Sequence, residues 1–139
     1  MIVLDTNVIS EIMRPRPDPA VLLWLDRQPA ISIWTTSVST FEIRFGLRSM
    51  AEGRKRSTLI AFFDRWLAEV VQQRIASFDH AAAKIAADLA AVRRASGHPG
   101  DARDTMIAGI VLASRATLAT RNFKHFEDIA GSVVNPWEA

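Results

Sequence analysis

Residues 2–7 read Ile-Val-Leu-Asp-Thr-Asn, a short apolar run that ends in a carboxylate, a hydroxyl and an amide. The run Ile2–Leu4 is typical of a buried β-strand, and Asp5–Asn7 is typical of the turn or helix cap that follows one. Further strands are expected at Ile31–Trp34, Arg74–Ala76, Thr117–Thr120 and Ser132–Val134. Short strands that alternate with helices predict an α/β sandwich around a short, mainly parallel sheet.

The segments between these strands carry helical signals. Prolines 15, 17 and 19 end the first helix, and Gly97 with Pro99 ends the Ala-rich one. Ser37 is expected to cap the third helix at its N-terminus. We found no repeat and no linker, so residues 1–139 are expected to form one domain. The expected helices are Val8–Met13, Ala20–Arg27, Val38–Met50, Ser57–Val71, Ala81–Ala95 and Asp101–Arg115.

The composition excludes several classes of site. Apolar residues make up 49% and charged residues 23% of the 139 residues, which is enough to build a core and argues against disorder. A net charge of +2 is not by itself a nucleic-acid signature. Because the chain has no cysteine, disulfides, thiolate zinc sites, iron–sulfur clusters and cysteine nucleophiles are excluded. The three scattered histidines argue against a histidine-rich metal site.

The distribution of charge also bears on location. The uncharged stretch Pro29–Phe41 is too short and too rich in Ser and Thr to span a membrane. The N-terminus lacks a basic region and meets a carboxylate at Asp5, which argues against a signal peptide. The sequence therefore predicts a soluble, cytoplasmic protein.

Asp5 and Glu42 are the first two candidate site residues. Asp5 follows the first strand, and open parallel sheets bind ligands at the carboxyl ends of their strands. The alternative is a helix cap, a role that Thr6 could also fill. In the third helix, Val38, Phe41 and Phe45 have the spacing of a buried stripe, into which Glu42 falls.

A carboxylate in a buried stripe requires a cation, a hydrogen-bond donor or access to solvent. Glu42 is therefore expected to serve a function. The alternative is that it lies at the edge of the stripe and reaches water or an arginine of the same helix.

Two further acids open the last helix. Asp101 is a credible N-cap, and the helix dipole favours negative charge there, so we interpret Asp101 as structural. Asp104 precedes the apolar run Met106–Ala108 and is expected to point inward. Acids from a strand end, a helix face and a helix start repel one another unless a cation lies between them. Oxygen ligands without His or Cys favour Mg²⁺ or Mn²⁺, ions that catalyse phosphoryl chemistry.

Four motifs resemble those of PIN domains in order and spacing, and the resemblance covers essentially the whole chain. The tail Val133–Trp137 is similar to the one common in bacterial VapC and FitB-type toxins. The motifs are Leu4–Asn7, Phe41–Glu42 followed by Gly46–Leu47, Arg103–Ala108 and Thr120–Phe126.

This resemblance implies a small α/β/α fold and a Mg²⁺- or Mn²⁺-dependent endoribonuclease that acts as the toxin of a type II toxin–antitoxin system. It also implies an RNA substrate and a homodimer held by a cognate antitoxin in a heterotetramer or larger assembly. Asp5, Glu42 and Asp104 correspond to the family's catalytic, metal-binding acids. Thr6, Asn122 and Arg121 are candidate accessory residues, and Arg121 is a candidate phosphate contact because it follows a strand end.

The chain departs from the family pattern at Asn122 and His125, where many members carry Asp. The second metal position of the family is therefore in doubt here, because neither residue supplies a carboxylate. The departures also leave open a degenerate PIN-like module that binds RNA or a partner without cutting. Metal-dependent RNA cleavage separates these two functions.

A haloacid-dehalogenase-type phosphatase is a further alternative, since its nucleophilic Asp also ends the first strand. Such enzymes need a second Asp two residues on, where this chain has Asn7, and the chain leaves no room for a cap domain.

Overall fold

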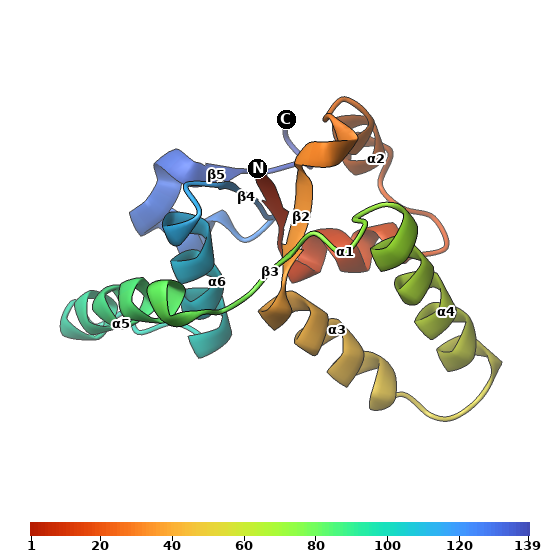
Figure 1. Cartoon of the computed structure of the whole chain (residues 1–139), viewed down its shortest axis with the longest axis horizontal. Coiled ribbons are helices and arrows are strands. Elements are labelled where there is room, and N and C mark those ends of the chain that lie inside the picture. The colour runs from red at the N-terminus through yellow and green to blue at the C-terminus, as the bar shows by residue number, and fades with distance from the viewer.

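A five-stranded sheet forms the centre of the computed structural model, which describes residues 1–139 (Figure 1). All neighbouring strands are parallel, and their order is β3-β2-β1-β4-β5. Because β1 lies in the middle and the chain order reverses there, its carboxyl end is the switch point at which open α/β sheets bind ligands. The strands are β1 (Ile2–Leu4), β2 (Ile33–Thr36), β3 (Ile75–Ala76), β4 (Thr117–Ala119) and β5 (Val133–Val134).

Helices cover both faces of the sheet (Figure 1). The sheet separates two apolar cores, one packed with α1, α2, α3 and α4 and the other with α5 and α6. Side chains of a strand alternate between faces, so neighbouring Val3 and Leu4 enter different cores. This arrangement confirms the expected α/β/α sandwich. The helices are α1 (Thr6–Ile12), α2 (Pro19–Asp26), α3 (Ser37–Arg48), α4 (Arg54–Glu69), α5 (His80–Ala95) and α6 (Ala102–Ala113).

Some element boundaries differ from those expected. The second strand begins at Ile33, because residues 30–32 form a turn of 3₁₀ helix that leaves Ile31 exposed. Helix α3 begins at Ser37, and Thr36 is its N-cap in place of Ser37. A second 3₁₀ segment, Phe123–Ser132, fills the interval between β4 and β5. None of the helices combines the length and apolar character needed to cross a bilayer.

Candidate active site

The carboxylate of Asp5 is held in place at the junction of β1 and α1. It accepts hydrogen bonds from the backbone amide of Thr6 at 2.8 Å and from the hydroxyl of Thr120 at 2.8 Å. The Nδ2 group of Asn7 is 3.4 Å from its second oxygen. With 3% of its surface exposed, Asp5 is more than a solvated cap. Asp5 caps α1, and it also presents a fixed, buried carboxylate at the centre of the sheet edge.

Glu42 lies on α3 beside the start of α1. Its Oε1 atom accepts a hydrogen bond from the Thr6 hydroxyl at 3.1 Å, and Oε2 is 3.7 Å from Nη1 of Arg103. Its ionic partner is therefore an arginine from α6, not one from its own helix. The Thr6 hydroxyl also approaches Ser39 at 3.0 Å, so α1 and α3 are linked at this point.

The expected buried stripe of α3 is correct at Val38, which is buried, but wrong at Phe41 and Phe45. Phe41 and Phe45 are 59% and 62% exposed and stack on each other at the surface. The helix instead buries the row Ser39, Ile43 and Leu47, which has i, i+4 spacing. Ile43 and Leu47 of this row pack in the core shared with α1 and α4, whereas the adjacent Glu42 lines the cleft. Glu42 therefore lies at the border between the core and the cleft.

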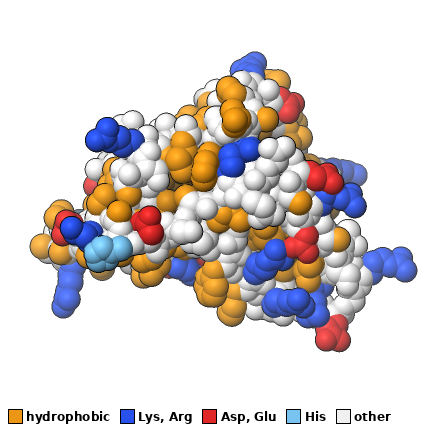
Figure 2. Space-filling model, in the orientation of Figure 1, with side chains coloured by type: hydrophobic (Ala, Val, Ile, Leu, Met, Phe, Trp, Pro, Cys, Tyr) orange, Lys and Arg blue, Asp and Glu red, His pale blue; other side chains and the backbone are white.

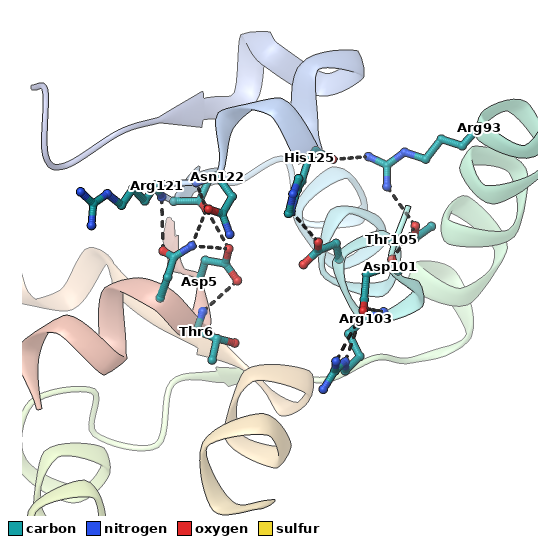
Figure 3. A network of polar contacts seen from close by, with 12 residues as sticks. Asp5, Thr6, Arg93, Asp101, Arg103, Thr105, Arg121, Asn122 and His125 are labelled. Carbon is teal, nitrogen blue, oxygen red and sulfur yellow. Dashed lines mark hydrogen bonds and ion pairs between the residues drawn. The ribbon is translucent and has the colours of Figure 1, made fainter. Parts of the chain in front are cut away.

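Asp101 is the N-cap expected from the sequence, whereas Asp104 lies further into the helix and lines the cleft. Asp101 is the N-cap of α6 and accepts a hydrogen bond from the Arg103 amide at 2.7 Å. Asp104, one turn into the helix, is half-buried, and its Oδ2 atom is 3.0 Å from Nδ1 of His125. Figure 3 shows His125 of this pair, together with Asp101 and Arg103 at the start of α6.

The pKa values of Asp5, Glu42 and Asp104 are all raised by burial. The pKa of Asp5 is raised to about 6, mainly by burial and also by the charges of Asp104 and Glu42, which together outweigh the hydrogen bonds from Thr120 and Thr6. Burial also raises the pKa values of Glu42 and Asp104. Three carboxyl groups whose ionised forms disfavour one another form a site that a cation would stabilise.

The six candidate residues come together at one place. They line a cleft of about 470 Å³ at the carboxyl edge of the sheet. The residues are Asp5, Thr6, Glu42, Asp104, Arg121 and Asn122.

The side chains do not form a closed set of metal ligands, since no three Asp, Glu or His groups are close enough to hold one ion directly. Asp104 is turned to His125, and Glu42 to Thr6 and Arg103. The donors are all oxygens of the kind that hard cations take. Mg²⁺ retains several waters and needs only one or two direct carboxylates, so this donor set fits it chemically.

Sequence reasoning missed several supporting residues. Thr120 follows the last residue of β4 as Asp5 follows that of β1, so the rule that selected Asp5 could also have found Thr120. Asn7 donates to Thr120 at 3.1 Å and accepts the Arg121 amide at 3.2 Å. The buried Arg93 gave no signal, because its partner Asp128 is 35 residues away.

Comparison with known proteins places this arrangement in a family. Residues 2–132 match the PIN domain. The chain belongs to the PIN domain family. Plasmid stability protein StbB of Pseudomonas syringae pv. tomato is 38% identical to this PIN domain over 139 residues, which is 100% of each chain.

Two further relatives cover nearly the same length. VapC ribonuclease Y4jK of Sinorhizobium fredii is 36% identical and toxin FitB of Neisseria gonorrhoeae is 32% identical, each over 99% of both chains. The solved structure of FitAcB from N. gonorrhoeae superimposes on this PIN domain with a TM-score of 0.91 and 32% identity, covering 100% of both chains. These findings confirm the resemblance to PIN domains and argue against the alternative of a haloacid-dehalogenase-type phosphatase.

Proposed function

We propose that this PIN domain is the endoribonuclease toxin of a toxin–antitoxin pair and hydrolyses RNA phosphodiester bonds. The observation that carries the proposal is the convergence of Asp5, Glu42 and Asp104 on one cleft from three separate elements. The proposal is also supported by similarity along nearly the whole chain to VapC ribonuclease Y4jK and to toxin FitB.

Asp5, Glu42 and Asp104 would hold Mg²⁺ or Mn²⁺, with Asp5 as the fixed anchor. When bound, such an ion supplies activation of water and neutralisation of charge on the phosphate. The chain's own residues prepare the carboxylates: Thr120 orients Asp5, and Thr6 orients Glu42.

Two accessory residues complete the cleft. The exposed guanidinium of Arg121 is available to a phosphate, and Asn122 offers an amide at the position where many relatives carry Asp. An amide ligates through its carbonyl oxygen but adds no charge, so we propose that a single metal position is sufficient for this chain.

The proposed partner is a cognate antitoxin. An apolar groove of about 1080 Å³ lies between α1, α3 and α4, and it shares Thr6, Arg14 and Glu42 with the acidic cleft. The groove is lined by four basic residues, Arg14, Arg54, Lys55 and Arg103. Figure 2 shows several basic side chains over the α3 and α4 end of the molecule, with acidic ones among them. A helical or extended antitoxin segment in the groove would carry a basic side chain into the acidic cleft, where an Arg fork matches carboxylates.

The assembly of relatives agrees with this proposal. The solved relatives include FitAB bound to a DNA fragment, with a TM-score of 0.89 and 32% identity over 99% of this chain and 96% of that chain. We propose a homodimer that binds its antitoxin in a heterotetramer or larger complex. Expression of the chain alone should stop growth, and co-expression with the antitoxin should restore it.

Metal-dependent RNA cleavage tests the enzymatic function. Wild type should cleave single-stranded RNA in Mg²⁺ or Mn²⁺ but not in EDTA, and Asp5→Asn and Asp104→Asn should abolish cleavage. Asp101→Asn is the matched control, because it removes a charge from the same helix end and Asn is an equally good N-cap.

Full activity of Asp5→Asn, or of wild type in EDTA, would overturn the metal mechanism. RNA binding without cleavage in either metal would support the degenerate binding module instead.

A further inference from the structure

Arg14 is held beside the cleft by a buried carboxylate. Its Nη1 atom is 3.1 and 3.2 Å from the two carboxylate oxygens of Glu11, which is only 5% exposed. Glu11 also accepts the backbone amide of Asp18 at 2.9 Å, so its own position is fixed by the start of α2. The Arg14 side chain is 62% exposed, and its other N–H groups make no hydrogen bond within the chain. Its guanidinium is therefore oriented and still has free donors.

Arg121 is the second oriented arginine of this cleft. Its backbone amide is bonded to Asn7 in the first turn of α1, and its guanidinium lies 5.0 Å from the ring centre of Trp137. Helix α1 has seven residues and is about 10 Å long, and Arg14 lies two residues beyond its last residue, Ile12. The two arginines therefore lie near opposite ends of α1, on a cleft that also contains the three acids.

A polyanionic substrate needs these cations, because Glu11 adds a fourth carboxylate to a cleft that already holds three. The planar Arg fork matches phosphate oxygens, and an arginine already fixed in direction loses less entropy on binding. A cleft of about 470 Å³ has the size of a small-ligand site and admits a single strand but not a double helix.

We infer that a single RNA strand lies along α1, with one backbone phosphate on Arg121 and another, further from the acids, on Arg14. This inference rests on the proposed ribonuclease function and adds the path of the substrate. Glu11 is then a positioning residue for Arg14. The contact between Arg14 and its phosphate contributes to RNA affinity but does not involve the phosphate that reacts.

Binding of a short, labelled single-stranded RNA to the Asp5→Asn protein in Mg²⁺ tests the inference without cleavage. Adding Arg14→Ala should weaken binding about two- to fivefold, the range of an exposed ion pair. It should also reduce the slope of log K against log salt concentration by about 0.7, which corresponds to one lost phosphate contact on a single strand. Arg14→Lys should keep the slope, because it keeps the charge.

Arg16→Ala is the matched control, because Arg16 is exposed two residues further on and does not line the cleft. It should leave affinity and slope unchanged. Glu11→Gln also removes a negative charge from the cleft, so the orienting effect of Glu11 is measured as a coupling between Glu11 and Arg14. Arg14→Ala should weaken RNA binding less in a Glu11→Gln background than in the protein with Glu11, because the guanidinium is then no longer oriented.

An unchanged slope in Arg14→Ala would overturn the inference. An equal loss of RNA affinity from Arg14→Ala with and without Glu11→Gln would overturn the positioning role of Glu11. Normal RNA binding by Arg14→Ala with lost binding of the antitoxin would assign Arg14 to the protein interface and also overturn it. A wild-type protein that cleaves no RNA would instead refute the proposed function, which is a separate result.

Discussion

The Nδ1 atom of His125 lies 3.0 Å from Oδ2 of Asp104, so the acid at the start of α6 is held by a side chain from the segment after β4. The same aspartate raises the pKa of Asp5 through its charge. His125 stabilises the ionised form of Asp104, whereas burial and the negative charge of Asp101 disfavour that form.

Asp104→Asn should raise the melting temperature of the metal-free protein, because it removes charge repulsion at almost constant volume. Mn²⁺ should stabilise wild type by binding the folded state and should stabilise the variant much less. Thermal unfolding in EDTA and in Mn²⁺ measures both effects. If Asp104 served only the helix dipole, the variant would instead lose about 0.3–1 kcal/mol in EDTA.

The stability of the metal-free protein should fall as pH rises through about 6, because burial raises the pKa of Asp5 in the folded state to that value. A raised carboxyl pKa favours folding below the unfolded value of 3.8, and this contribution is lost as the group ionises in the folded protein. Between pH 5 and pH 7.5 the expected loss is about 1 kcal/mol, because one pH unit below the folded pKa corresponds to about 1.4 kcal/mol. Denaturant unfolding at pH 5 and pH 7.5 in EDTA should show wild type more stable at pH 5.

Asp5→Asn is the control for this pH effect and should flatten the dependence between pH 5 and pH 7.5. An equally steep dependence in the variant would assign the effect to other groups.

Arg93→Met should lower the free energy of unfolding by about 2–4 kcal/mol, because Arg93 ties α5 and α6 to the segment after β4. Its guanidinium, in a residue only 6% exposed, binds both oxygens of Asp128 at 2.7 and 2.8 Å and the Thr105 hydroxyl at 2.9 Å. Arg94→Ala, in the next, exposed position, should change stability by less than about 0.5 kcal/mol. Equal effects of the two substitutions would contradict a structural role for the Arg93 cluster.

Gly109→Ala and Gly46→Ala should change stability in opposite directions, although both glycines are helical. A Cβ atom at Gly109 would lie 2.6 Å from the Ala82 carbonyl oxygen and 2.7 Å from the Ala86 Cβ atom, so α5 and α6 would have to separate. We expect a loss of about 1–3 kcal/mol. Gly46 has open space around it, so Gly46→Ala should gain up to about 1 kcal/mol from helix propensity. Denaturant unfolding of both variants measures this contrast.

Local signals predicted the order of the elements and the chemistry of the candidate site. Asp5 was found because a parallel sheet places strand ends at one edge, and Asp101 because helix caps are local. The phase of α3 was not predictable, because two apolar rows compete in its sequence. Only packing against α1 and α4 turns Ser39, Ile43 and Leu47 inward and leaves Phe41 and Phe45 in solvent.

Contacts between distant parts of the sequence were also beyond local reasoning. Arg93 appears as one of two neighbouring arginines at the end of an Ala-rich helix, which is typical of a solvated helix end. Its burial depends on Asp128 and Thr105 reaching the same point from other elements.

The cleft is lined by residues from Asp5 to Trp137, which span almost the entire chain. During synthesis at about 5–20 residues per second, an amino-terminal segment can fold before the rest exists, but it cannot contain the complete cleft. The complete lining of the cleft therefore requires translation as far as Trp137. A chain interrupted before Trp137 therefore lacks a complete cleft, whatever part of the sheet has already formed.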